Sequence, residues 1–141
     1  MTDVSIALDV ASIEVPMDAW SEPFWAAAAD RRLLLPRCGN CGLFRWPPGP
    51  FCPDCHSQKV DWAQPGEGRI YTFTLVPRPA RDDGQPAGVS APALIEFADA
   101  PGVRLMSTIV GAPVDSLRIG APVRVDWIQA ANATVPVFRL Q

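Results

Sequence analysis

The chain has 141 residues, of which 48% are hydrophobic, and a net charge of −3. This length predicts one ordinary domain or two very small ones, and the composition excludes an intrinsically disordered protein. The isoelectric point near 5.0 argues against a general nucleic-acid binder, whose surface is usually strongly basic.

The first residues show neither the basic region nor the continuous apolar region of a secretory signal. No stretch approaches the ~20 uninterrupted apolar residues of a membrane span. We therefore expect a cytoplasmic protein with no membrane partner. In that compartment thiols stay reduced, and paired cysteines more often bind metal than form disulfides.

Residues 1–17 form an acidic leader. Within it, Val4, Ile6, Leu8 and Val10 alternate with small or polar residues, which is the period-2 pattern of a strand. Two interpretations stay open: a strand that docks on the rest of the chain, or a loose terminal tail.

Residues 18–35 predict a helix followed by a short strand. Ser21 is a suitable N-cap, and Pro23 is tolerated in a first helical turn. The aromatic residues here, which include Trp25, are expected to pack in a core, although their density also suits an exposed surface that binds a partner. Four residues are spaced to share one helical face: Trp20, Phe24, Ala27 and Ala28.

Residues 36–65 carry all four cysteines and are rich in Pro and Gly. The cysteines are spaced C-x2-C, ten residues, C-x2-C. Two residues between cysteines let both sulfurs of one turn face a single ion, and a second such turn completes a tetrahedral set. Gly39 and Gly42 ease the first turn, and Pro53 stiffens the second. The predicted metal ligands are Cys38, Cys41, Cys52 and Cys55.

Zinc is the expected ion, and iron bound as in rubredoxin is the alternative, because the ligand set is the same. Disulfides and coincidental core cysteines fit a reducing compartment and paired spacing less well. Four thiolates leave no open coordination position, so we expect a structural rather than a catalytic site. His56, the single histidine, is not needed as a ligand and is expected to lie exposed beside the site.

From residue 66 onward, short β-prone runs alternate with turn residues. Five such runs with no credible helix between them predict a small barrel or sandwich. Residues 77–92 hold four prolines and two glycines, and we expect them to form a long loop. Tyr71 and Phe73 are either core residues or stacking platforms. The runs span residues 70–76, 93–97, 103–110, 123–128 and 135–140.

Charge is unevenly distributed along the chain. Residues 1–30 hold six acidic residues and no Lys or Arg, whereas residues 31–59 hold five cations against Asp54 alone. This basic middle suits a local anionic ligand or partner, such as coenzyme A. Solvated surface charge explains any single arginine equally well.

The residue set offers little for catalysis. If the cysteines bind metal, no free thiol nucleophile remains, and one histidine beside a metal site makes a poor general base. No glycine-rich loop joins a strand to a helix, so nucleotide-binding motifs are absent. We expect a chain that is not catalytic alone, while a site formed between subunits stays open.

Five segments of the sequence are distinctive when taken together: RLLLPRCGNCG, FRWPPGPFCPDC, GEGRIYTFTLVPRP, LRIGAPVRVDW and TVPVFRL. With these segments the chain resembles the DUF35 family over roughly residues 18–140. The resemblance implies a mostly β fold with an N-terminal helix, a rubredoxin-like zinc ribbon over residues 36–65 and a five-stranded OB-fold barrel over residues 66–141. Among site residues only the four cysteines carry over, and Arg78 occupies a motif position without an assigned role.

Members of this family accompany thiolase-fold enzymes, including thiolases, retro-aldolases that shorten sterol-type side chains, and acyl-CoA synthases. Others are joined to MaoC-like hydratases. The resemblance therefore implies a zinc-binding, non-catalytic subunit of a thiolase or aldolase hetero-oligomer, which holds the complex together and borders the acyl-CoA passage. The leader and the loop around residues 82–88 lie outside the resemblance and are expected to influence partner choice.

Two further hypotheses stay open. A zinc ribbon joined to an OB-fold also suits a module that binds single-stranded nucleic acid. A stand-alone acyl-CoA-binding protein would use the basic middle for the anionic end of coenzyme A.

Overall fold

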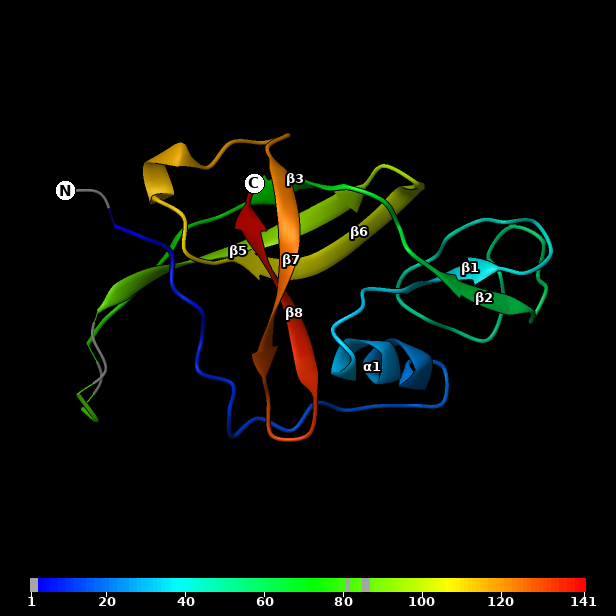
Figure 1. The fold of residues 1–141 in the computed structure, drawn as a ribbon, viewed down its shortest axis with the longest axis horizontal. Coiled ribbons are helices and arrows are strands. Elements are labelled where there is room, and N and C mark those ends of the chain that lie inside the picture. Colours follow the sequence, from blue (N-terminus) through cyan, green and yellow to red (C-terminus); the bar gives the residue numbers. More distant parts are fainter. Residues whose placement is uncertain (1–2, 81, 85–86) are drawn as a thin grey trace.

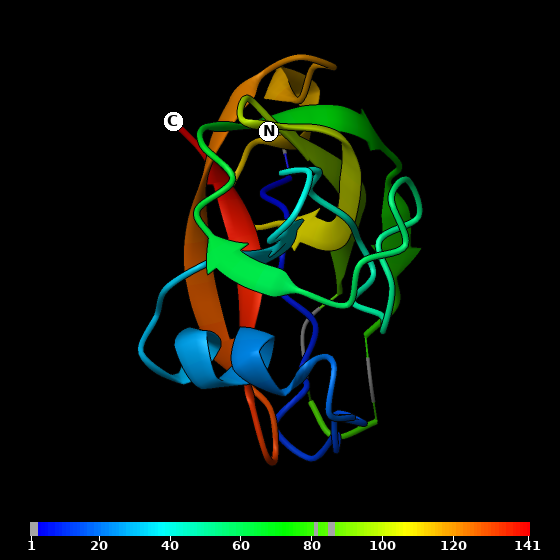
Figure 2. The same ribbon diagram turned by 90° about the vertical axis from the view of Figure 1, so that its right-hand side faces the viewer.

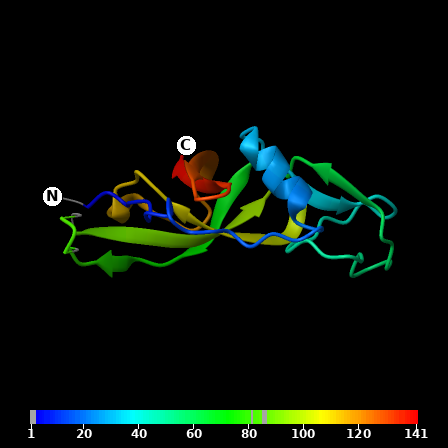
Figure 3. The same ribbon diagram turned by 90° about the horizontal axis from the view of Figure 1, so that it is seen from below.

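The computed structural model describes residues 3–80, 82–84 and 87–141, and in this part of the chain the fold is mostly β with one N-terminal helix. A small ribbon of β1 (Leu35–Cys38) and β2 (Val60–Ala63) lies at one end of the long axis, and a barrel fills the rest (Figure 1). Figure 3 shows how elongated the molecule is. Within the described residues, no helix has the length and apolar character that crossing a membrane requires.

The barrel is closed because β3 pairs antiparallel with both β5 and β7. Around the barrel the order is β3, β5, β6, β8, β7 and back to β3, and β6 runs parallel to β8. The predicted five-stranded OB-like barrel is confirmed, and Figure 2 shows its strands curving behind the ribbon. The strands are β3 (Gly68–Phe73), β4 (Val76–Arg78), β5 (Gly88–Phe97), β6 (Ala100–Ile109), β7 (Pro122–Gln129) and β8 (Thr134–Leu140).

The loop expected over residues 77–92 is shorter than predicted. Strand β4 continues to Arg78, and β5 begins at Gly88 rather than at residue 93. The first three residues of β5 pair with β4, Val89 also forms a bridge with Ser5 of the leader, and pairing with β6 begins at Ala91. The local sequence does not reveal these partners. The expected loop is therefore wrong at both ends.

Pro92 lies inside β5, although a proline in a predicted run usually argues against a central strand. Its carbonyl oxygen accepts a hydrogen bond from the backbone nitrogen of Thr74 at 3.0 Å, and its Cα lies opposite Thr108 of β6. The strand thus continues through Pro92 because the carbonyl oxygen of the proline still accepts a hydrogen bond, although proline has no N–H group to donate.

Helix α1 (Glu22–Ala29) follows a turn that Asp18 and Ser21 close together. The backbone nitrogen of Ser21 donates to Asp18 Oδ1 at 2.7 Å, and that of Asp18 donates to Ser21 Oγ at 3.1 Å. Ser21 is the N-cap residue but makes no side-chain cap bond to the helix. The helix packs against β8, as Figure 1 shows.

One face of α1 is buried through Phe24, Ala27 and Ala28, as the spacing predicted. Trp20 was expected on that face, but its exposed fraction is 50%. The reason is that Trp20 precedes the first helical residue and lies in the turn, where helical spacing does not set its direction. Trp25 is half-buried and meets the ring of Phe24 edge-on, with centroids 4.9 Å apart.

The acidic leader docks on the barrel in its described part. The backbone nitrogen of Ser5 donates to the carbonyl oxygen of Ala112 at 2.7 Å, and that of Gly111 donates to the carbonyl oxygen of Ser5 at 2.8 Å. Of the alternating apolar residues, Val4 and Leu8 are exposed and Ile6 and Val10 are half-buried, while the polar Ser5 is buried. The hydroxyl of Ser5 accepts from the backbone nitrogen of Ala112 at 3.1 Å, which satisfies it in the interior.

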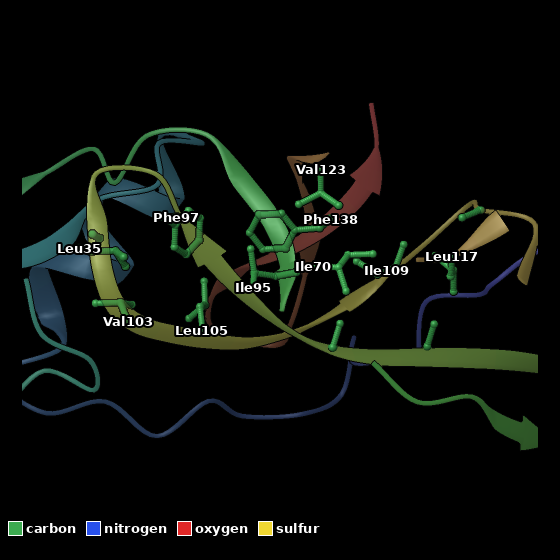
Figure 4. Packing of buried hydrophobic residues seen from close by; sticks show 14 of the residues in the cluster. Leu35, Ile70, Ile95, Phe97, Val103, Leu105, Ile109, Leu117, Val123 and Phe138 are labelled. Atoms are coloured by element: carbon green, nitrogen blue, oxygen red, sulfur yellow. The ribbon is translucent and has the colours of Figure 1, made fainter. Parts of the chain in front are cut away.

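The core of the barrel consists of alternate residues from its strands (Figure 4). Ile70, Ile95 and Ile109 are fully buried, and the rings of Phe97 and Phe138 lie 6.2 Å apart. Leu35 of β1 belongs to the same cluster, so the ribbon and the barrel share one core. Burying such side chains contributes roughly 1.5–3 kcal/mol each.

Candidate metal centre

The ribbon presents the four predicted cysteines from two turns. Strand β1 starts at Leu35 and ends on Cys38, whose Cα lies opposite Val60 of β2. The short strand was expected to end at residue 35, but it lies over Leu35–Cys38 and leads directly into the first cysteine turn. The second turn, which carries Cys52 and Cys55, lies between β1 and β2 in the chain.

The four sulfurs converge. Their Sγ atoms all lie within 4.8 Å of one another, and none is in a disulfide. The Sγ atoms of Cys38 and Cys55 are 3.5 Å apart, and those of Cys41 and Cys52 are 3.6 Å apart. A disulfide needs about 2.05 Å. A tetrahedron with zinc–sulfur bonds of about 2.3 Å has edges of about 3.8 Å, so the set fits a four-thiolate zinc site.

Backbone donors face the first sulfur. The nitrogens of Asn40 and Cys41 both donate to Cys38 Sγ at 3.4 Å, and the side-chain amide of Asn40 donates to Cys55 Sγ at 3.5 Å. Such N–H donors stabilise negative charge on sulfur and fix its direction. Asn40 therefore connects the two turns, a contact that the cysteine spacing alone does not predict.

The two turns have the same backbone geometry. In the first, the nitrogen of Gly42 donates to the carbonyl oxygen of Cys38 at 3.0 Å, and in the second that of His56 donates to the carbonyl oxygen of Cys52 at the same distance. Both donors have positive φ, 81° for Gly42 and 65° for His56. The side chain of His56 is exposed, so the structure gives this residue a backbone role beside the site.

Gly39 is needed for a different reason. A Cβ placed on it would approach the Cβ of Lys59 to 3.0 Å, because the backbone nitrogen of Gly39 donates to the carbonyl oxygen of Lys59 at 2.9 Å. Close approach of two backbones, rather than a left-handed conformation, explains this glycine.

The surroundings of the four thiols shift their pKa values in different directions, and this pattern favours a cation at the centre. Hydrogen bonds from backbone nitrogens, first that of Cys41, lower the pKa of Cys38 to about 6 against the effect of burial. The backbone nitrogen of Cys55 likewise lowers the pKa of Cys52. For Cys41, the backbone N–H of Leu43 acts in the opposite direction, but burial and the neighbouring thiols together raise its pKa to about 12.

Four thiolates this close repel one another, so they cannot all ionise without a counter-charge. A divalent ion supplies that charge and deprotonates its ligands. With four sulfurs around it, such an ion has no open position for substrate, and its contribution is to hold the ribbon folded.

The other residues singled out from the sequence lie away from this centre. Arg78 is on β4, where its Nε donates to Ser90 Oγ at 3.2 Å and joins β4 to β5. The guanidinium of Arg104 lies 4.0 Å from the centroid of the Tyr71 ring and covers one face of that exposed ring. Phe73 is half-buried against the core. Phe73 therefore contributes to the core, and one face of the Tyr71 ring is already occupied by Arg104.

Sequence reasoning did not find three surface hollows. One is lined by Trp20, Arg45 and Trp62 and has a volume of about 300 Å³. A second, of about 370 Å³, lies between the end of α1 and the barrel and carries Arg31, Arg32 and Arg124. A third, of about 290 Å³, is mostly apolar and has the exposed Met106 at its edge. Each combines segments far apart in the chain, so no local motif marks it.

Two family models match adjacent parts of the chain. The model described as "ChsH2, rubredoxin-like zinc ribbon domain" matches residues 25–61, and the one described as "ChsH2, C-terminal OB-fold domain" matches residues 62–127. The zinc-ribbon match and the convergence of the four sulfurs together indicate a structural zinc ion.

Among solved structures, a chain of the Ltp2-ChsH2(DUF35) aldolase is similar, with a TM-score of 0.74 and 33% identity, over 90% of this chain and 98% of that chain. A DUF35-family protein of unknown function from Sulfolobus solfataricus shares the fold, with a TM-score of 0.62 and 17% identity over 89% of this chain and 87% of that chain.

A curated relative is the "Probable enoyl-CoA hydratase alpha subunit" of Thermomonospora curvata. It is 39% identical over 119 residues, which cover 82% of this chain, and the chain spans only 36% of the length of that relative. Ribbon, barrel and both family matches agree: the chain belongs to the DUF35 family of proteins that join a rubredoxin-like zinc ribbon to an OB-fold.

Proposed function

We propose that this chain is the zinc-binding, non-catalytic subunit of a cytoplasmic hetero-oligomer whose partner is a thiolase-fold aldolase acting on CoA thioesters. The observation that supports this most is the match to the chain of the Ltp2-ChsH2(DUF35) aldolase, which extends over 98% of that chain at 33% identity. In this proposal the partner carries out carbon–carbon bond cleavage. The DUF35 chain holds the assembly together and borders the passage of the acyl-CoA.

The arrangement of groups in the described residues agrees with an accessory role. The thiols converge on a closed four-sulfur centre, and the histidine lies exposed with its backbone in a turn. An ion pair joins β8 to β7, with Arg139 Nε 2.6 Å from Asp126 Oδ2. The guanidinium lowers the pKa of Asp126 and so holds its carboxylate in the charged form. These groups are engaged in structure rather than grouped around a reacting atom.

The test is co-expression with a thiolase-fold aldolase encoded beside this chain, followed by affinity purification and native mass spectrometry. We expect a stable hetero-oligomer that cleaves a β-hydroxyacyl-CoA, and no turnover by the isolated DUF35 chain. A folded, zinc-loaded chain that stays monomeric beside the aldolase would contradict the proposal. Turnover by the isolated chain would contradict its non-catalytic part.

A MaoC-like hydratase is the second candidate partner. The observation that favours it is the 39% identity to the "Probable enoyl-CoA hydratase alpha subunit", of which this chain matches about a third of the length. The same co-expression with a hydratase in place of the aldolase distinguishes the two. Hydration of an enoyl-CoA by the co-purified complex would favour the hydratase.

A further inference from the structure

Arg45 is a buried cation whose charge is not matched within the described part of the chain. Its exposed fraction is 8%. The Nη2 group donates to the carbonyl oxygen of Gly49 at 3.1 Å, while Nε and Nη1 are covered and have no hydrogen-bond partner among the described residues. The backbone of Arg45 is fixed by its nitrogen, which donates to the carbonyl oxygen of Pro36 at 3.0 Å.

This arrangement is unfavourable in the isolated chain. A guanidinium stays charged in proteins, so burial cannot be relieved by loss of a proton. A buried charge without an opposite charge carries a large desolvation cost, and a buried donor without an acceptor adds to it. Such groups call for an explanation, and an anion supplied from outside the chain is a direct one.

Arg45 lines the hollow of about 300 Å³ between the start of α1 and the ribbon. Trp20 and Trp62 also line it, together with prolines that make its walls stiff. Figure 2 presents this end of the molecule to the viewer. Large apolar side chains lie exposed in and beside it, with exposed fractions of 50% for Trp20, 53% for Phe51 and 39% for Val60.

Two features favour a protein segment as the occupant over a small anion. Tryptophan and arginine around an apolar surface are the side chains that dominate protein–protein interfaces. Charge also selects the partner, because Arg45 is the only charged side chain among the described residues that line the hollow. An acidic segment therefore matches the charge of this hollow.

We propose that this hollow is the docking site for an acidic segment of a partner protein, in which a carboxylate pairs with Arg45 and a neighbouring apolar side chain packs on Trp20. The identity of the partner, the aldolase, rests on the proposed function. The acidic and apolar character of the docked segment rests only on Arg45 and the tryptophans.

The experiment measures the dissociation constant between the full chain and the purified aldolase. Trp20→Ala and Arg45→Met should each weaken binding at least tenfold, whereas Arg124→Gln, which removes an exposed arginine from a different hollow, should not change it. Arg45→Met should also keep the zinc content and a melting temperature at or above that of the parent chain, since it removes an unmatched buried charge. A purely structural arginine would instead lower the melting temperature.

If the parent chain binds the aldolase and both hollow variants bind equally well, the docking inference is overturned while the proposed function stands.

If the parent chain does not bind the aldolase, the proposed function fails, and binding of a short peptide tests the docking inference separately. The probe is the peptide acetyl-Pro-Leu-Asp-Glu-Leu-amide, and the control is the same peptide with Asn and Gln in place of Asp and Glu. Binding of each peptide is detected by NMR as changes in the chemical shifts of the tryptophan indole N–H signals. Shifts at Trp20 and Trp62 with the acidic peptide alone support docking. No shift, or the same shift with sodium acetate, overturns it.

Discussion

His56 occupies, in the second cysteine turn, the left-handed backbone position that Gly42 occupies in the first. The two residues donate equivalent hydrogen bonds to the first cysteine of their turn, but only one of them is a glycine. The left-handed region favours glycine, and a side chain there costs about 1–2 kcal/mol.

Exchanging side chains at these two positions should therefore have opposite effects. Gly42→Ala should lower the free energy of unfolding by about 1–2 kcal/mol, all of it backbone strain, because a Cβ there meets no atom within 4 Å. His56→Gly should raise it by up to about 1 kcal/mol, since relief of strain is partly offset by chain entropy. Denaturant unfolding of the zinc-loaded variants measures both. Equal effects in one direction would show that the turns are not equivalent.

Removing one sulfur should release the metal. In Cys38→Ser the zinc content should fall from about one ion per chain to near zero, because a structural site needs all four ligands. The ribbon should then lose its amide-exchange protection. Elemental analysis and hydrogen exchange measure the two effects. His56→Gln is the matched control and should keep the metal, and loss of zinc there would make the histidine a ligand.

Zinc affinity should depend on pH in two stages. The pKa of Cys41, raised to about 12, means that binding displaces its proton at every working pH, so affinity should fall by about tenfold or more per unit as pH decreases from 8 to 7. The pKa of Cys38, lowered to about 6, means that this thiol is already ionised at pH 7 and competes for a proton only below about pH 6. The slope should therefore steepen below pH 6. Competition against a chromophoric chelator follows this, and a pH-independent affinity would contradict it.

The buried hydroxyl of Ser5 should matter more than that of an exposed serine. Ser5→Ala leaves the backbone nitrogen of Ala112 without its hydroxyl acceptor in the interior, which should cost about 1–3 kcal/mol. Faster amide exchange at Gly111 and Ala112 should accompany this loss. Ser116→Ala, whose hydroxyl lies exposed, is the control and should change stability by less than about 0.5 kcal/mol. Equal costs would show that the leader contributes little to the fold.

The sequence predicted those parts of the structure that local patterns determine. The paired spacing brought the four cysteines together, Pro23 and the spacing of Phe24 located the helix, and runs of β-prone residues located the five barrel strands. Each of these signals lies within a few residues, and tertiary packing agreed with it.

The remaining features depend on contacts between distant segments. Strand β5 extends back to Gly88 because β4 pairs with its first three residues and the leader forms a bridge at Val89. Ser5 is buried because Ala112 offers it both a donor and an acceptor. Arg45 could not be recognised as buried from its neighbours in the chain. The hollow that it lines is assembled from the turn before α1, the loop between β1 and β2, and β2 itself. Periodicity reports only which residues share a face, not which distant segment covers that face.

The shared core limits how freely evolution can exchange the two halves of this chain. The two family matches meet between residues 61 and 62, which is inside β2, and Leu35 reaches from β1 into the cluster that holds Phe138. Recombination at that point would divide β2, and loss of the Leu35 side chain would leave a cavity in the shared core. A ribbon transplanted from a distant homologue therefore has to bring a side chain of matching shape at position 35.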